Sequence, residues 1–246
     1  MDAAHTALVA GAALAAGAVN AIAGGGSLLT FPALVAAGLP EITASVTNTV
    51  ALCPGYLGAT WAQRRELRDQ RRRIALFAPA GVIGGLAGGL LLLHTGEAAF
   101  ARVVPFLILF AALLLAAQDR LRALIGRAHR REMWAVVPVL LACVYGGYFG
   151  AGLGVIILGA LAIVVDDSMT RLNALKQAIS LACNIAAATF FLFSGRIDWT
   201  VTAIMAGASL AGGVLGGALA SRIPARVLRV VVISFAIVVG VFYLVR

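Results

Sequence analysis

The chain has 246 residues, of which 62% are hydrophobic and 12% charged, and its mean hydropathy of +1.01 excludes an ordinary soluble protein. A small globule cannot hold so much apolar surface in its interior, so lipid must cover most of it. The formal net charge of +9 comes largely from the segments 64–73 and 119–132, which favour Arg-rich cytoplasmic loops of a membrane protein over a nucleic-acid surface.

Ten apolar segments separated by polar breaks predict an all-α, polytopic integral membrane protein. They cover residues 6–22, 27–38, 43–62, 74–93, 99–118, 134–149, 153–165, 172–194, 200–220 and 228–245. The segments 27–38 and 153–165 are too short to cross a bilayer, which takes about 20 residues. We expect them to be broken or re-entrant half-helices, shielded by protein or by an aqueous cavity, beside about eight spans.

An internal repeat appears when the chain is compared with itself at an offset of 128 residues, without a gap. Gly24 and Gly26 then match Gly152 and Gly154, and the run GGLAGG at 84–89 matches GGVLGG at 212–217. A chance match of scattered glycines is the alternative, but two GGxxGG runs at one offset favour duplication. The predicted organisation is a transmembrane repeat over 1–118, a basic cytoplasmic linker over 119–128 and a second transmembrane repeat over 129–246.

The arginines change sides between the two halves. The loop 63–73 contains six arginines, whereas its repeat partner 191–201 contains only Arg196. Conversely, the hairpin 94–98 contains none, whereas its partner region holds Arg222, Arg226 and Arg229. Because arginine excess marks the cytoplasmic side, this pattern predicts repeats of inverted topology, as in many secondary transporters.

The segment 172–194 carries a polar stripe on one helical face. The stripe consists of Asn173, Lys176, Gln177, Ser180 and Asn184. Lys176 is the single lysine of the chain, and no acidic residue of its segment lies at helical spacing from it. An ammonium group in a membrane span costs about 2.5–3.5 kcal/mol, so we expect a counter-charge, a wet cavity or a bound anion. The alternative is that Lys176 lies near the helix end and extends to the interface.

The first half has an uncharged version of this stripe at the equivalent positions. It consists of Ser45, Asn48, Thr49, Leu52 and Tyr56. We expect the two stripes to face each other and to enclose one site, with Asn48 and Thr49 as candidate binding residues. Small polar residues that join helices in membranes are the structural alternative for Ser45 and Thr49.

Glycine clusters interrupt both halves at equivalent positions, in NAIAGGGSLLTF at 20–31 and YGGYFGAGLGVII at 145–157. Such a break exposes backbone N–H groups at the start of the next half-helix, where an anion can bind. Two equivalent breaks point to a midplane binding site in a transporter. The GGxxGG runs are predicted instead to serve close helix packing. With the two stripes, the candidate substrate-binding residues are Asn20, Gly24, Gly25, Gly26, Ser27, Asn48, Thr49, Gly152, Gly154, Asn173, Lys176 and Gln177.

The sequence has no pattern typical of catalysis or of a metal site. It contains no HExxH or GxSxG motif, and none of its ten acidic residues lies deep in a predicted span. We therefore expect neither an enzyme nor a cofactor or metal. Asp166 and Asp167 are candidates for proton coupling, and capping of the helix that begins near Met169 is the alternative.

Long stretches of the chain resemble one transporter family. NAIAGGGSLLTFPALVAAGLP and ASVTNTVALCPGYLGATWAQRREL are similar to the first-half signature of the TauE/SafE sulfite exporter family, also called the toluene sulfonate uptake permeases. YGGYFGAGLG and RLNALKQAISLACNIAAATFFLFSG resemble its second half. The family is described as seven or eight spans from a four-span duplication, which agrees with ten segments if each short segment is a re-entrant half of its neighbour.

This resemblance implies movement of sulfite, an organosulfonate or a related small anion across the bacterial inner membrane. We expect an alternating-access transporter with the anion between the two glycine breaks. A passive anion channel of the same architecture is the alternative, and a membrane scaffold protein is disfavoured by the charged and broken elements in the core.

Overall fold

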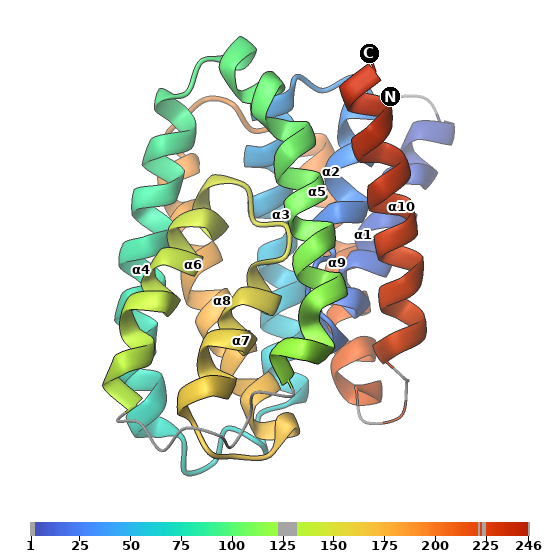
Figure 1. Ribbon diagram of the computed structural model, residues 1–246. Coiled ribbons are helices and arrows are strands. Elements are labelled where there is room, and N and C mark those ends of the chain that lie inside the picture. Colours follow the sequence, from blue (N-terminus) through green and yellow to red (C-terminus); the bar gives the residue numbers. More distant parts are fainter. Residues whose placement is uncertain (1–2, 123–131, 221, 223–224, 246) are drawn as a thin grey trace.

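The computed structural model describes residues 3–122, 132–220, 222 and 225–245, and every regular element within them is a helix (Figure 1). The elements are α1 (Ala3–Ile22), α2 (Ser27–Ala36), α3 (Glu41–Ala62), α4 (Arg71–His94), α5 (Glu97–Arg122), the 3₁₀ turn η1 (Glu132–Ala135), α6 (Val136–Tyr148), α7 (Leu153–Val164), α8 (Met169–Phe191), α9 (Trp199–Leu219) and α10 (Ala225–Val245). All ten predicted segments correspond to helices. The expected linker 119–128 begins as part of α5, and its remainder lies outside the described residues.

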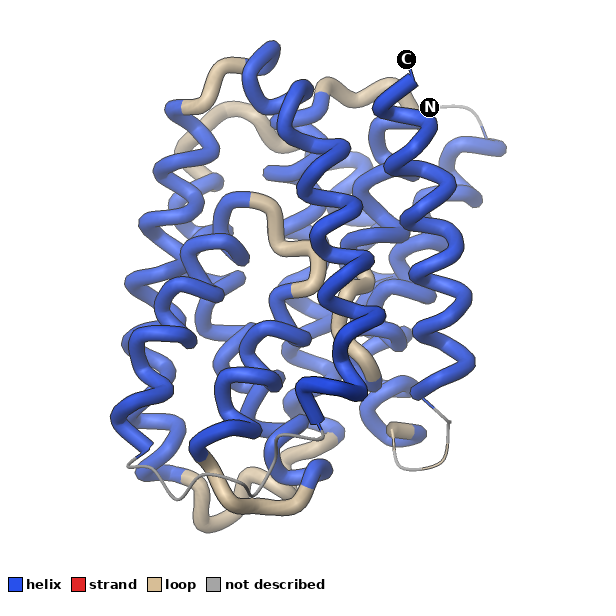
Figure 2. The backbone as a smooth tube through the Cα atoms, in the orientation of Figure 1, coloured by secondary structure: helices blue, strands red, loops and turns tan. Residues whose placement is uncertain are grey.

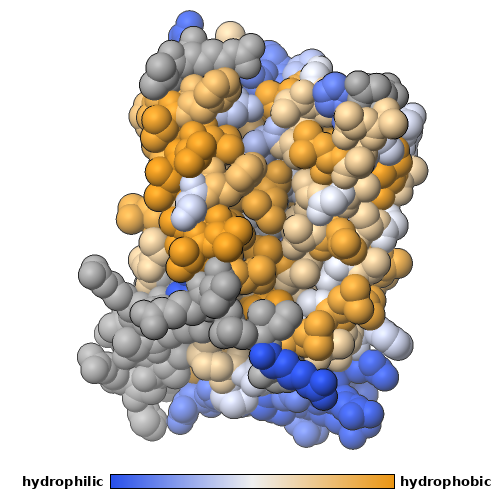
Figure 3. Space-filling model, turned by 90° about the vertical axis from the view of Figure 1, so that its right-hand side faces the viewer, coloured by the Kyte–Doolittle hydropathy of each residue, from blue (hydrophilic) through white to orange (hydrophobic). Residues whose placement is uncertain are grey.

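The surface of the bundle suits a bilayer. Among the described residues, five helices are long and apolar enough to cross a membrane, namely α1, α4, α5, α8 and α9. In Figure 3, apolar residues cover the middle of the molecule and polar residues gather at one end. Helices satisfy their own backbone hydrogen bonds, which lipid requires. The prediction of an all-helical, multi-pass membrane protein is therefore confirmed.

The two glycine clusters end their helices in the middle of the molecule. The loops 23–26 and 149–152 lie at mid-height, whereas the other described loops lie at the two ends (Figure 2). Gly24 and Gly25 have φ angles of 77° and 104°, and Gly150 and Gly152 have angles of 80° and 78°. Glycine adopts this conformation without a steric penalty, so the predicted breaks are confirmed and have a local cause.

The GGxxGG runs form the contact surfaces of α4 and α9, as predicted. In each run, the first glycines of the two pairs face one helix and the second glycines face another. These are Gly84 and Gly88 against α6, Gly85 and Gly89 against α8, Gly212 and Gly216 against α1, and Gly213 and Gly217 against α3. At most of these positions a Cβ atom would overlap backbone of the neighbouring helix. Close backbone approach of this kind holds helices together in lipid, where apolar burial contributes little.

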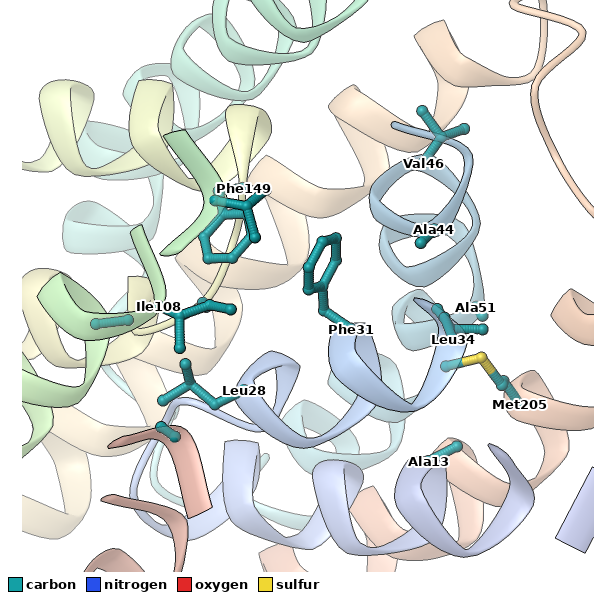
Figure 4. Packing of buried hydrophobic residues seen from close by; sticks show 14 of the residues in the cluster. Ala13, Leu28, Phe31, Leu34, Ala44, Val46, Ala51, Ile108, Phe149 and Met205 are labelled. Carbon is teal, nitrogen blue, oxygen red and sulfur yellow. The ribbon is translucent and has the colours of Figure 1, made fainter. Parts of the chain in front are cut away.

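Aromatic side chains fill the space between the breaks and the end of the molecule that holds both termini. Phe31 of α2 meets Phe149 of the α6–α7 loop edge to face, with ring centroids 5.2 Å apart (Figure 4). Phe100, near the start of α5, packs against Tyr148 at 5.6 Å. All three phenylalanines are buried. This aromatic cluster of Phe31, Phe100, Tyr148 and Phe149 packs together beside the α6–α7 break.

Candidate functional site

The Lys176 side chain is buried between two helices. Only 1% of the residue is exposed, although it lies in the first half of α8. Its Nζ donates hydrogen bonds to the carbonyl oxygen of Asn20 at 3.2 Å and to Oδ1 of Asn173 at 2.8 Å. The Lys176 side chain therefore points into the protein and does not extend to the molecular surface.

The end of α1 supplies the acceptors for this face of α8. The N–H groups of Ala23 and Gly24 both bond to the carbonyl of Val19, at 2.8 and 2.9 Å, because the chain turns sharply at Gly24. The next carbonyl group, that of Asn20, instead accepts hydrogen bonds from side chains of α8. In addition to the bond from Lys176 Nζ, it accepts one from Gln177 Nε2 at 2.9 Å. Carbonyl groups at a helix C-terminus lack partners within the helix and carry partial negative charge, which suits an ammonium group.

The two glycine breaks touch each other beside Lys176. A Cβ atom on Gly154 would lie 3.3 Å from Gly24 Cα and 3.3 Å from Lys176 Cδ. The side chain of Asn20 also stays at this junction, where its Oδ1 accepts from the N–H of Gly26 at 2.7 Å. The N-termini of α2 and α7 begin at these breaks, so their positive dipole ends lie near the buried ammonium. The ammonium and the starts of α2 and α7 thus contribute positive potential at this junction, and the carbonyl end of α1 offsets part of it.

A cavity of about 460 Å³ lies next to this cluster, at the end of the bundle that carries the Arg-rich loop. Its wall includes Ile22 at the end of α1, Gln63 and Arg65 after α3, and Asn173 of α8. Asn173 Nδ2 donates to Gln63 Oε1 at 2.8 Å and to the Ala21 carbonyl at 2.9 Å. The cavity therefore extends from that end of the molecule to the side chain that holds Lys176.

The structure does not bring all the predicted site residues together. Asn48 precedes Gln63 by 15 residues, and a helix rises about 1.5 Å per residue, so the two lie about 20 Å apart along α3. Its neighbour Thr47 accepts a hydrogen bond from the N–H of Asp198, in the loop at the opposite end of the bundle, at 3.1 Å. Asn48 is 2% exposed, and Thr49 Oγ1 bonds to the carbonyl of Ser45 in its own helix at 3.0 Å. The two polar stripes are thus displaced along the helices and do not enclose one point.

The remaining glycines and the serine of the breaks have separate positions. Gly25 lies against side chains of Leu28 and Leu115, and a Cβ on Gly152 would meet Ala111 at 3.3 Å. Ser27 opens α2 and is buried. These residues shape the two turns around the junction of Gly24 and Gly154.

Gln63 is a site residue that sequence reasoning missed. It follows the last turn of α3 at the start of an Arg-rich loop, and its residue type gives no signal there. It is nevertheless only 5% exposed. Only the packing of α3 against α8 identifies it.

The ion pairs at the same end of the bundle were also missed. Asp167 binds Arg73 and Arg171, and Arg73 also binds Glu132 at 2.8 Å. Burial alone would raise the pKa of the Asp167 carboxyl, but hydrogen bonds from Arg171 and Arg73 outweigh burial and lower that pKa. The cap of α8 is Ser168, whose side chain accepts from the N–H of Arg171 at 3.4 Å, so Asp167 does not serve as the cap.

Comparison with known proteins gives consistent relatives. The chain is 30% identical over 220 residues to the probable membrane transporter protein YfcA of Escherichia coli (strain K12), covering 86% of this chain and 77% of that protein. It is 28% identical over 232 residues to a probable membrane transporter protein of Haemophilus influenzae, covering 92% and 89%. A probable membrane transporter protein of Sinorhizobium sp., ORF9, is 26% identical over 237 residues, covering 93% and 88%.

No solved structure matches the chain. The family model for "Sulfite exporter TauE/SafE" matches residues 9–243, which is nearly the whole chain and includes both glycine breaks and Lys176. The protein is therefore a membrane transporter of the TauE/SafE sulfite exporter family.

Proposed function

We propose that this protein is a secondary transporter in the bacterial inner membrane that carries sulfite, an organosulfonate or a related small sulfur-containing anion. The description of the matching family supports this substrate class. The observation that carries the proposal is the burial of Lys176 where two half-helix N-termini meet. Dipole ends and an ammonium group at one buried point favour an anion over a cation or a neutral solute.

The anion binds at the junction of the two breaks. It lies between the turns Gly24 to Ser27 and Gly152 to Gly154, and Lys176 supplies the charge. Because the N–H groups of Gly24 and Gly26 are bonded to Val19 and Asn20, the proposed backbone donors are those of Gly25, Ser27, Gly152 and Gly154. Asn20, Asn173 and Gln177 hold the ammonium and the end of α1 in place through the hydrogen bonds described above. Asn48 and Thr49 belong to the part of the path on the other side of the breaks. Asn48 Oδ1 is buried there without a hydrogen-bond partner among the described residues.

The proposed transporter consists of two inverted repeats with alternating access. In support, α3, α4 and α5 begin at residues 41, 71 and 97, and α8, α9 and α10 begin 128 residues later, at 169, 199 and 225. The loop 63–70 and its counterpart 192–198 lie at opposite ends of the bundle (Figure 1). By the positive-inside rule, the Arg-rich end is cytoplasmic. The cavity opens at this end and the aromatic cluster fills the other, as expected of an inward-open conformation.

The substrate is identified by a thermal-shift panel on purified protein, with sulfite, sulfate, thiosulfate, methanesulfonate and acetate. An anion that binds only the folded state raises the unfolding temperature. The anion with the largest effect is then used in a counterflow assay with proteoliposomes. Acceleration of uptake by unlabelled anion inside the vesicles indicates a carrier, and its absence indicates the passive channel.

In the same assay, Lys176→Met should reduce uptake to the background of empty vesicles, because the anion loses its counter-charge. Asn184→Ala is the matched control: Asn184 is a buried polar residue of the same helix, and its Nδ2 bonds to Ser180 within α8. Uptake by Asn184→Ala should stay within about twofold of the wild type, since Asn184 is uncharged and lies about 12 Å along α8 from Lys176. Wild-type uptake by a folded Lys176→Met protein would refute the proposed site.

A further inference from the structure

The hydrogen bonds that start at Lys176 have a fixed direction. An ammonium group only donates, so the oxygen of the Asn173 side chain must face it and the Asn173 amide nitrogen must face away. That nitrogen donates to Gln63 Oε1 at 2.8 Å, so Gln63 must present its oxygen to Asn173. Gln63 Nε2 is consequently the last group in this series of hydrogen bonds, and it is a donor.

This last donor has no acceptor in the part of the chain that the structure describes. Gln63 Nε2 is buried and makes no hydrogen bond to any described residue. Gln63 is also part of the wall of the 460 Å³ cavity. A buried N–H group without an acceptor is rare in proteins and favours the arrival of one.

The charges around the cavity are mixed, and the buried donor of Gln63 favours an anion at its inner wall. Arg65 and the first turn of α8, at Met169 and Thr170, favour an anion, whereas Glu66 and the C-terminal turn of α9 favour a cation. A cation would need an unused oxygen at the inner wall. The Gln63 oxygen is already bonded to Asn173, and the group left over is a donor.

We propose that this cavity is a second anion-binding site, in which Gln63 Nε2 and the Arg65 guanidinium bind the oxygen atoms of a small sulfonate or similar oxyanion. This inference rests on the proposed function, because the anion would rest here between the Lys176 site and the cytoplasm. Because Gln63 Nε2 is buried, a rotation of the Gln63 side chain would have to bring its N–H to an anion at the wall. Because the hydrogen bonds that start at Lys176 run in one direction, the group that Gln63 has left for the cavity is a donor and not an acceptor.

The test measures protection of a cysteine by methanesulfonate and does not require transport. Thr170, an exposed residue of the cavity wall, is replaced by cysteine in a protein whose Cys53, Cys143 and Cys183 are changed to alanine. The rate of labelling by neutral N-ethylmaleimide is measured at constant ionic strength with increasing methanesulfonate. Choline, a cation of similar size, serves as the counter-probe.

We expect methanesulfonate, and not choline, to slow the labelling. Gln63→Met removes the donor with little change in volume and should raise the half-protecting concentration about tenfold, as expected for one hydrogen bond to a charged group. Arg65→Gln should raise it as well. Arg64→Gln is the matched control, because the Arg64 guanidinium lies over the ring of Trp61, and this change should have no effect.

Protection by choline alone, no protection at all, or equal protection in folded Gln63→Met protein would overturn the second site. None of these results would affect the Lys176→Met transport prediction, which concerns the junction of the breaks. Conversely, full transport by Lys176→Met together with methanesulfonate protection would reject the proposed central site and retain the cavity site. The two proposals therefore fail separately.

Discussion

At the scale of single residues, Lys176 and the C-terminal end of α1 satisfy each other's need for hydrogen-bond partners. A buried ammonium needs acceptors, and the last carbonyl groups of a helix need donors. The bond from Lys176 Nζ to the Asn20 carbonyl meets both needs, and Asn173 and Gln177 add further bonds to the same helix end. Lys176 thus holds α8 against the break at the end of α1, so movement of α1 relative to α8 must change its surroundings.

Gly154 tests how closely this junction must fit. In Gly154→Ala, the new methyl group would press on Gly24 and on the side chain of Lys176, each 3.3 Å away. Because displacement of a binding group by about 1 Å can cost 10²-fold, we expect anion affinity to fall about tenfold or more. The measurement is the anion concentration needed for half of the maximal thermal shift. Gly11→Ala, at a position with open space around its Cα, should bind the anion like the wild type.

At the scale of helices, the glycines of α4 and α9 replace side-chain packing by backbone contact. Each of these two helices lies between two others, α6 and α8 for α4, and α1 and α3 for α9. The same residue type thus has two roles in this protein: positive φ at the breaks and lack of a Cβ in α4 and α9. The spacing distinguishes these roles in the sequence, because GGxxGG repeats on helical faces and GGG followed by Ser does not.

Gly88→Ala should destabilise the bundle, because its methyl group would overlap the Val144 carbonyl and approach the N–H of Tyr148. Overpacking of this kind costs about 1–3 kcal/mol. Gly207→Ala, on the exposed side of α9 with no atom nearby, should be neutral or stabilising by up to about 1 kcal/mol. Thermal unfolding of both variants in one detergent measures the difference, and equal unfolding temperatures would contradict the packing role.

At the scale of the whole molecule, the halves are joined at the Arg-rich end by ion pairs. Arg73 of the first half binds Asp167 and Glu132 of the second half, and Arg171 binds Asp167 from α8. At the other end, Glu97 accepts from the N–H of Ile42 at 2.8 Å and pairs with Arg196. Each end of the bundle therefore has its own group of charged residues that connects the two halves.

The lowered pKa of Asp167 makes stability depend on acid. The carboxylate form is favoured in the folded protein, so its contribution is complete above the ordinary pKa of about 3.9 and disappears as the pH falls through the lower folded value. Asp167→Asn should cost roughly 1–3 kcal/mol at pH 7, and its difference from the wild type should shrink below pH 4. Unfolding temperatures across this range measure it, with Asp166→Asn, at the exposed neighbour, as the control. A constant difference down to pH 2 would contradict the assigned role.

The helices, the two breaks and the buried lysine could be predicted from the sequence alone. Hydropathy and residue spacing are local properties, and lipid leaves the backbone few choices other than a helix. The positive φ angles at Gly24 and Gly152 follow from the residue type itself. Family membership rests on the same local stretches and on the match over residues 9–243.

Only the tertiary structure decided which residues meet. The sequence pattern suggested that Asn48 lies opposite Lys176, because the two are equivalent in the repeat. α3 and α8 instead run in opposite directions, so Gln63 at the end of α3 reaches Asn173 and Asn48 lies near the other end. The partners of Lys176 include the main-chain carbonyl of Asn20, and a backbone group carries no residue-specific signal. Sequence periodicity determines the face of a helix that a residue occupies, whereas the direction and axial position of the neighbouring helix determine its partner.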